Sequence, residues 1–229
     1  MGKPELEQAP KAASFVTLGV TGHRHLFEAD RLPLTQRVRE FFLENFSPDD
    51  RVLVLDALAE GADQLVAEVV LDLMRSERPN LRLAAFLPMP LSFYEADFAE
   101  EEPLSPTAGE LATPSPRQRF YRLLRQVGQI AELPLLAQNQ ELALAQKPIQ
   151  RLLQYDLLGQ QLALRSQLLL ALWDGVSTGL KAGGSGDVVR RILTRPEGGN
   201  VFQLITPQSK KGCERPKNAL ETRWLSQWN

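Results

Sequence analysis

The sequence contains a single cysteine, Cys213, and only two histidines among its 229 residues. A single thiol excludes an internal disulfide framework and every cysteine-rich zinc or iron–sulfur site. The longest apolar run, residues 168–173, is far shorter than the roughly 20 residues that a membrane-spanning helix needs. The N-terminal segment MGKPELEQAPKAAS is polar and lacks the apolar core of a signal peptide. These absences favour a cytoplasmic protein that is neither secreted nor embedded in a membrane.

Excess charge of one sign is also missing. Lys and Arg number 26 against 28 Asp and Glu, which gives a formal net charge of −2 and a sequence pI near 5.8. This balance disfavours a dedicated nucleic-acid binder, which carries a strongly basic surface. With 43% apolar and 24% charged residues, the composition is that of an ordinary globular domain.

Short apolar segments rich in β-branched residues alternate with amphipathic segments along most of the chain. The pattern predicts strands at residues 14–21, 51–58, 81–87, 132–137, 166–173 and 201–206. It predicts helices at residues 32–46, 65–74, 117–131, 148–165 and 187–194. Such alternation indicates an α/β fold, a Rossmann-like and mainly parallel β-sheet with helices on both faces.

One domain, residues 14–206, accounts for all of these elements. Residues 1–13 are expected to form a flexible extension, and residues 207–229 a basic C-terminal tail. Eight of the 16 prolines lie in residues 88–148, which predicts a proline-rich insertion near residues 100–117.

The signatures of several common activities are absent. The sequence has no GxGxxG after the first strand, no GxxxxGK[ST], no HExxH and no GxSxG. His23 and His25 lie two residues apart with no cysteine partner, which is a weak arrangement for binding a metal. We therefore expect neither a metal nor a resident cofactor.

Two glycine-containing loops follow the first two predicted strands, where ligands bind in sheets of this kind. In the first loop, Thr21 offers a hydroxyl, Gly22 an open backbone, and His23 and Arg24 groups that can pair with a phosphate. The alternative for this loop is a tight turn with a surface arginine. In the second loop, Gly61 allows a phosphate or ribose to come close.

Asp63 follows in the same loop and also has a structural explanation, since an acidic residue in the first turn stabilises a helix.

The loop after the strand at residues 166–173 is the most informative. Asp174 comes directly after that strand, and Gly183, Gly184, Ser185, Gly186 and Asp187 lead into a helix. Glycines immediately before a helix can form a backbone nest for a phosphate, although a flexible linker is the alternative. Asp187 can cap the helix or accept a hydrogen bond from a ribose hydroxyl.

Taken together, the segments GVTGHR, ALAEGADQLVAE, LPMPLSFYEADF, ALWDG and GGSGDVV resemble the SLOG superfamily. This group of Rossmann-like domains includes relatives of the Lonely Guy phosphoribohydrolases, the DNA-processing protein DprA and ligand-sensing domains of certain channels and bacterial defence proteins. The resemblance implies nucleotide binding. The residues that it implies are Thr21, Gly22, His23, Arg24, Gly61, Asp63, Asp174 and the segment Gly183 to Asp187.

Three functions are compatible with this resemblance. The first is a ligand-sensing domain for a nucleotide or a nucleotide derivative. The second is an N-glycosidase or phosphoribohydrolase, with Asp187 or Glu60 as the catalytic carboxylate; Lonely Guy enzymes carry PGGxGTxxE, whereas Arg190 stands here in place of that glutamate. The third is a DprA-like adaptor for single-stranded DNA, suggested by the basic tail. The leucine-rich segment 152–164 can also form a homo-oligomer interface.

Overall fold

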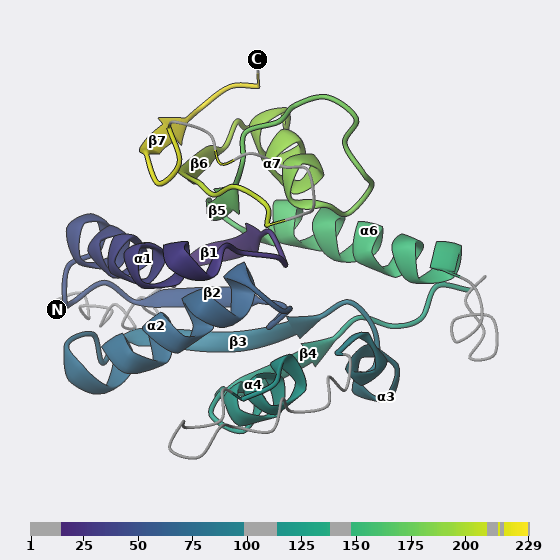
Figure 1. Cartoon of the computed structure of the whole chain (residues 1–229), viewed down its shortest axis with the longest axis horizontal. Helices are drawn as coiled ribbons and strands as arrows, with labels where there is room; N and C mark the ends of the chain where they lie inside the picture. The colour runs from purple at the N-terminus through teal and green to yellow at the C-terminus, as the bar shows by residue number, and fades with distance from the viewer. Residues whose placement is uncertain (1–14, 99–113, 138–147, 210–214, 216–217, 229) are drawn as a thin grey trace, which may run out of the picture.

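The computed structural model describes residues 15–98, 114–137, 148–209, 215 and 218–228. Within them, a seven-stranded sheet has the order β4-β3-β2-β1-β5-β6-β7 (Figure 1). All neighbouring pairs from β4 to β6 are parallel, and β7 runs antiparallel to β6. The predicted α/β fold with a mainly parallel Rossmann-like sheet is confirmed.

The elements follow one another in strand–helix alternation. The strands are β1 (Val16–Gly22), β2 (Val52–Asp56), β3 (Leu81–Leu87), β4 (Gln129–Glu132), β5 (Leu168–Trp173), β6 (Asn200–Ile205) and β7 (Thr222–Leu225). The helices are η1 (Glu28–Asp30), α1 (Arg31–Asn45), α2 (Ala62–Ser76), α3 (Leu91–Tyr94), η2 (Glu95–Asp97), α4 (Pro116–Leu124), α6 (Pro148–Arg165) and α7 (Ser185–Leu193). In the described ranges, none of the helices has the length and apolarity needed to cross a membrane.

Two apolar cores lie on opposite faces of the sheet. Side chains alternate along each strand, so Val52 and Val54 of β2 join one core, whereas Leu55 joins the other. The first core also contains the buried faces of α1 and α2, and the second those of α6 and α7. Figure 1 shows α1 next to α2 beside the first three strands, and α6 next to α7 beside β5. Burial on both faces explains why the strands are almost continuously apolar in sequence.

The region around β4 differs from the prediction. The helix predicted at residues 117–131 ends at Leu124, and the strand predicted at residues 132–137 lies at residues 129–132. All four residues of β4 are exposed, so no burial pattern marks it. Backbone hydrogen bonds hold this edge strand, including one from Leu133 N–H to Leu87 C=O at 3.0 Å.

The C-terminal tail contributes a strand to the sheet. The prediction that residues 201–206 form the last strand is wrong. These residues correspond to β6, and β7 follows it and pairs with it. Its residues are mostly exposed and Trp224 packs on Phe202 with ring centroids 5.1 Å apart, so the strand lacks an apolar alternation. The extension at residues 1–13 and residues 100–113 of the predicted insertion lie outside the described residues.

Gly61 allows the backbone of the loop after β2 to lie directly against the backbone of the loop after β1. Its φ of +89° lies in the region that favours glycine, and an added Cβ would lie 2.1 Å from the Arg24 carbonyl oxygen. The next residue, Ala62, donates its N–H to the carbonyl of His23 at 3.0 Å. The glycine therefore fixes the start of α2 against the loop that follows β1.

We predict that Gly61→Ala destabilises the protein by at least about 2 kcal/mol, because the added methyl combines a strained φ with a backbone clash. Chemical denaturation measures this loss. Gly128→Ala is the matched control, since no atom lies within 4 Å of its added Cβ. Equal stabilities of the two variants would contradict the prediction.

Candidate functional site

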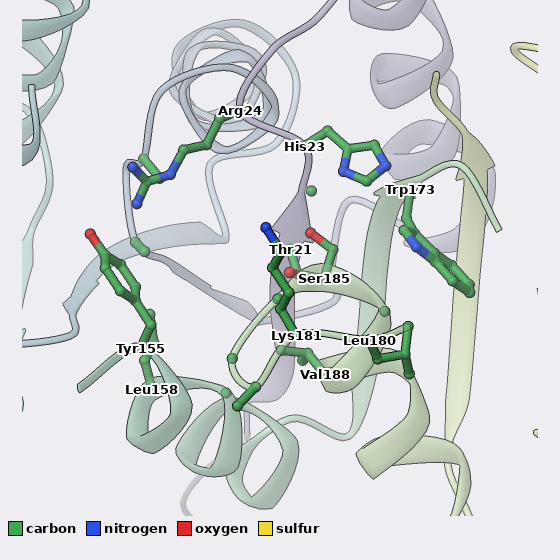
Figure 2. Close-up of a pocket in the computed structure, with 18 of the residues that line it drawn as sticks. Thr21, His23, Arg24, Tyr155, Leu158, Trp173, Leu180, Lys181, Ser185 and Val188 are labelled. Carbon is green, nitrogen blue, oxygen red and sulfur yellow. The ribbon is translucent and has the colours of Figure 1, made fainter. Parts of the chain in front are cut away.

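A cavity of about 680 Å³ opens at the carboxyl ends of β1 and β5. These strands are neighbours, but the chain leaves β1 toward β2 and leaves β5 toward β6, so their loops diverge. The walls come from the loop after β1, the start of α2, the loop between β5 and α7, and α6 (Figure 2). The cavity thus occupies the position at which open α/β sheets bind ligands.

His23 connects the two strand ends. Its backbone N–H donates to Leu172 C=O of β5, and its carbonyl accepts from Ala62 N–H of α2, each at 3.0 Å. Its Nε2 accepts from the N–H of Asp174 at 3.1 Å and lies 3.3 Å from the Asp174 Oδ2. Burial raises the pKa of Asp174, but interactions of its carboxylate with the His23 side chain, the Val176 N–H and Gln208 outweigh burial and hold the pKa below its usual value.

The loop before α7 forms a second wall. The first intrahelical hydrogen bond of α7 runs from Val188 N–H to Gly184 C=O at 3.1 Å, so the N–H groups of Ser185 and Gly186 precede the helical ladder. Both residues line the cavity, as does Lys181. In Figure 2, Ser185 and Lys181 lie on the loop that faces β1 across the cavity. This wall combines helix N-terminal donors with an ammonium group.

Asp187 holds this loop in place through hydrogen bonds of its carboxylate. Its carboxylate accepts hydrogen bonds from Arg190 at 2.6 Å, from Arg191 at 2.7 Å and from Gly183 N–H at 3.1 Å. Burial raises its pKa, but these hydrogen bonds together hold the pKa below its ordinary value. Asp187 is not among the residues that line the cavity, so its position fits a structural role rather than contact with a ribose.

Most of the residues predicted to bind a ligand do meet at the cavity. Those that line it are Thr21, Gly22, His23, Arg24, Asp63, Asp174, Gly183, Gly184, Ser185 and Gly186. Gly61, Asp187 and Glu60 do not line it. Neither residue that was predicted as a catalytic carboxylate therefore faces the cavity.

A pair of buried carboxylates lies instead at the end of β2 and in the first turn of α2. Asp56 is fully buried, and its Oδ1 accepts from Leu58 N–H at 2.6 Å. Asp63 is 7% exposed and lines the cavity. Burial raises the pKa of Asp63 to about 7, although Arg24 opposes this rise. Burial also raises the pKa of Asp56, and the neighbouring Asp63 charge raises it further.

Arg24 lies with these acidic groups and with an aromatic ring. Its Cζ is 5.1 Å from the ring centroid of Tyr155, and the two side chains point toward one another in Figure 2. Burial raises the pKa of both Asp63 and Asp97, and the charge of Arg24 opposes this rise. Arg24 therefore belongs to the acidic and aromatic side of the cavity.

Several lining residues were not predicted from the sequence. Lys181, Asp97 and Arg151 line the cavity, as does Gln208, which contacts both His23 and Asp174 at 3.4 Å. Arg151 and Tyr155 are four residues apart on α6, and this spacing places both on one helix face. It is the one feature of the sequence from which their joint position could have been predicted. Nothing in the sequence indicated that this face turns toward β1.

The C-terminal segment reaches the edge of the site. Trp228 stacks on Trp173, whose side chain lines the cavity, with centroids 6.1 Å apart and an interplanar angle of 18°. Arg215 binds the buried Asp30 through two nitrogens, and Arg223 donates to Gln203 at 2.7 Å. Two of the basic tail residues thus make structural contacts, which weakens the argument for a DNA adaptor.

Comparisons with known proteins do not assign the chain to a group: no family model matches it, and no curated protein sequence matches it. Among the described residues, no group of three or more His, Cys, Asp or Glu side chains is placed to hold a metal ion. The chemistry of the site therefore has to be argued from the cavity itself.

Asp63 makes the stability of the protein depend on pH. Its pKa is about 7 when folded and near 3.8 when unfolded, so the folded state binds the proton more tightly. Its contribution is present below the unfolded pKa and is lost as pH rises through about 7. We predict that Asp63→Asn removes this loss, which is on the order of 4 kcal/mol.

Urea denaturation across this pH range measures the effect. Asp72→Asn is the control, because Asp72 lies on the exposed side of the same helix and pairs with Arg39 at 2.7 Å. If wild type and Asp63→Asn lose stability in parallel, Asp63 is not the group that titrates.

Proposed function

We propose that this chain binds a nucleotide or a nucleotide derivative in the cavity between β1 and β5. The observation that carries the proposal is the N-terminus of α7 in the cavity wall. Ser185 and Gly186 supply N–H groups that precede the helical ladder, and Lys181 adds a positive charge on the same loop. Donors at a helix N-terminus together with a cation are a favourable site for a phosphate.

The local backbone supports this subsite. Gly183 adopts φ +70°, and an added Cβ there would lie 2.4 Å from the backbone of Tyr155, so the loop packs tightly on α6. Asp187 holds the same loop through the N–H of Gly183. The donors are therefore ordered before a ligand arrives, which lowers the entropic cost of binding.

The rest of the cavity suits a sugar and a base. Its volume of about 680 Å³ lies within the range of small-molecule sites. Asp63, Asp97 and Asp174 offer acceptors for hydroxyl or amino groups, and Tyr155 and Trp173 offer aromatic surface. A nucleotide contains all of these complementary groups in one molecule.

Membership of the SLOG superfamily is part of the proposal. In support of it, the segment GVTGHR ends β1 and GGSGDVV begins α7, so the motifs that carry the resemblance face each other across one cavity. This placement agrees with the phosphate and ribose contacts that the resemblance implies. The proposed role is that of a ligand sensor.

A thermal-shift screen with nucleoside monophosphates, ADP-ribose, NAD and cyclic nucleotides tests this function. A ligand that binds only the folded state raises Tm as its concentration passes Kd. We predict that Gly184→Glu weakens binding by about tenfold or more, because its carboxylate would oppose a phosphate beside the α7 donors.

Gly184 is the right position for this change, since it has φ −78° and an added Cβ lies 3.1 Å from the nearest atom. Gly128→Glu adds the same charge in open space and serves as the control. Nucleotide affinity unchanged in Gly184→Glu would exclude the α7 loop as the phosphate site.

Hydrolysis is the second candidate function, and Asp63 is the observation that favours it. A buried carboxyl group with a pKa of about 7 can both donate and accept a proton near neutral pH. The proposal therefore replaces Asp187 and Glu60 with Asp63 as the candidate acid or base. Release of a free base from a nucleotide would favour an N-glycosidase over a ligand sensor as the function of the protein.

If the protein is such a hydrolase, Asp63→Asn will lower base release by at least about a hundredfold while nucleotide binding persists. Chromatography of the same nucleotide mixtures measures the released base. Asp72→Asn should retain full activity, because it lies away from the cavity on α2. Binding without any released base in the wild type would leave the sensor function alone.

A further inference from the structure

The two ring nitrogens of His23 have different surroundings. Nε2 contacts Asp174 and Gln208, whereas Nδ1 makes no hydrogen bond within the described part of the chain. Nδ1 is also not one of the buried polar atoms that lack a partner, so it has accessible surface. His23 lines the cavity, and Figure 2 shows its imidazole above Thr21 and Ser185. The ring is therefore held at one nitrogen and open at the other.

The groups around Nε2 determine where the proton of the neutral ring lies. The backbone N–H of Asp174 points at Nε2 across 3.1 Å, and the amide nitrogen of Gln208 lies 3.4 Å from it. Both groups are donors, so Nε2 has to accept. A neutral imidazole carries one ring N–H proton, which here lies on Nδ1. The neutral ring of His23 therefore presents a hydrogen-bond donor at its open nitrogen.

The carboxylate of Asp174 is placed to hold a second proton on this ring. Its Oδ2 lies 3.3 Å from the His23 Nε2, and its Oδ1 accepts from Val176 N–H at 3.1 Å. The pKa of Asp174 is held below its usual value, so the group is ionised at neutral pH. A proton on Nε2 would be donated to Oδ2, because a carboxylate favours the charged form of a neighbouring imidazole. Both nitrogens of the imidazolium would then be donors.

His23 and the start of α7 meet the same strand end. The His23 backbone donates to the carbonyl of Leu172, and its Nε2 accepts from the N–H of Asp174. Trp173 lies between these two residues in the chain, and a Cβ added to Gly186 would lie 3.2 Å from its indole nitrogen. The open nitrogen of His23 and the N–H donors of α7 therefore border the cavity at the carboxyl end of β5.

We infer that His23 binds a phosphate oxygen through Nδ1–H and takes up one proton as it does so, and that the ligand carries a terminal phosphate. This inference deepens the proposed function and rests on it. The negative charge of the phosphate draws a proton from solvent onto Nε2, which then donates to Asp174 Oδ2. A terminal phosphate carries about 1.5 to 2 negative charges near pH 7, whereas a phosphodiester carries a single one. The terminal group therefore stabilises the imidazolium more strongly.

Other charged or titratable side chains also line the cavity. They are Arg24 and His25 of the loop after β1, Asp63 of α2, Asp97 of η2, Arg151 of α6 and Lys181 before α7. The basic groups disfavour a charged His23 before the ligand binds, and a bound phosphate offsets them. Asp63 competes for the proton, since its pKa is about 7 and a phosphate favours its protonated form. His23 and Asp63 therefore have to be separated by substitution.

Calorimetric titration of the full chain with AMP, GMP and the cyclic form of each tests the inference. Titrations at about pH 7.5 in buffers of different ionisation enthalpy count the protons taken up per ligand bound. We expect roughly half a proton or more for the monophosphates and less for the cyclic nucleotides. By linkage, the monophosphate affinity then falls about threefold or more between about pH 7 and pH 8.

Asp174→Asn is the most informative variant, because Val176 determines how the new amide is oriented. The Val176 N–H requires an acceptor, so the amide oxygen takes the place of Oδ1 and the amino group faces Nε2 of His23. The ring then keeps its proton on Nδ1 but loses the acceptor for a second one. We expect Asp63→Asn to retain proton uptake, and the double variant Asp63→Asn/Asp174→Asn to bind monophosphates with almost none.

Nitrogen NMR of the histidine rings gives a readout that depends on no variant. The chain has only two histidines, and His25 is exposed, so their signals can be told apart. Without ligand at about pH 7.5, His23 should show a protonated Nδ1 and an unprotonated Nε2. Saturation with AMP or GMP should protonate Nε2, whereas a ring that stays neutral overturns the inference.

His25→Gln is the matched control and should take up as many protons as the wild type. Proton uptake that disappears in Asp63→Asn, or that persists unchanged in His23→Gln, assigns the proton to another group and overturns the inference. Binding of the cyclic nucleotides alone also overturns it, and in each of these outcomes nucleotide binding stands. If no nucleotide binds, the proposed function fails and the inference fails with it.

Discussion

The divergence of the chain from β1 and β5 is the constraint on which the site depends. These two neighbouring parallel strands end side by side, and their loops leave in opposite directions, so the point between them is enclosed by those loops and by α6, which line the cavity. The backbone of His23 then ties three elements together at that point, because it bonds to both β5 and α2. The cavity is thus a consequence of strand order, and its side chains determine only what enters it.

The charged groups around the cavity form two sets on opposite sides, and each set has its own partners in the structure. Asp187 pairs with Arg190 and Arg191 of its own helix and does not line the cavity, whereas Ser185 and Gly186 at the start of α7 do. On the other side, Asp97 and Asp63 lie near Arg24, and burial raises the pKa of each. One end of the cavity therefore favours anionic groups, and the other favours hydrogen-bond donors.

Much of the fold is predictable from the sequence, because strands buried on both faces are almost continuously apolar. Leu168–Trp173 and Leu81–Leu87 are examples. The edge strand β4 was predicted a few residues too late in the chain and β7 was not predicted, since both strands bury little and depend on backbone pairing with β3 and β6. Alternation of apolar residues, on which the prediction relies, does not exist where both faces of a strand meet solvent.

The sequence predicts the part of the site that lies in glycine-containing loops, because such loops follow the strands at the edge where the cavity opens. Thr21, Arg24 and Ser185 line the cavity as predicted. The orientation of Asp187 was not accessible, because the two arginines that bind it lie on its own helix and also suit an exposed helix face. The contribution of α6 was missed for a different reason: only the packing of a distant helix against the sheet brings Arg151 to the loop after β1.

The indole pair formed by Trp173 and Trp228 gives the molecule an internal optical reporter. Trp173 lines the cavity, and Trp228 belongs to the C-terminal segment, yet their rings lie only 6.1 Å apart. Emission from such a pair depends on the surroundings of both rings. A change at the cavity and a change in the position of the C-terminal segment would therefore both alter the emission of this pair, to which the exposed Trp224 adds a separate contribution.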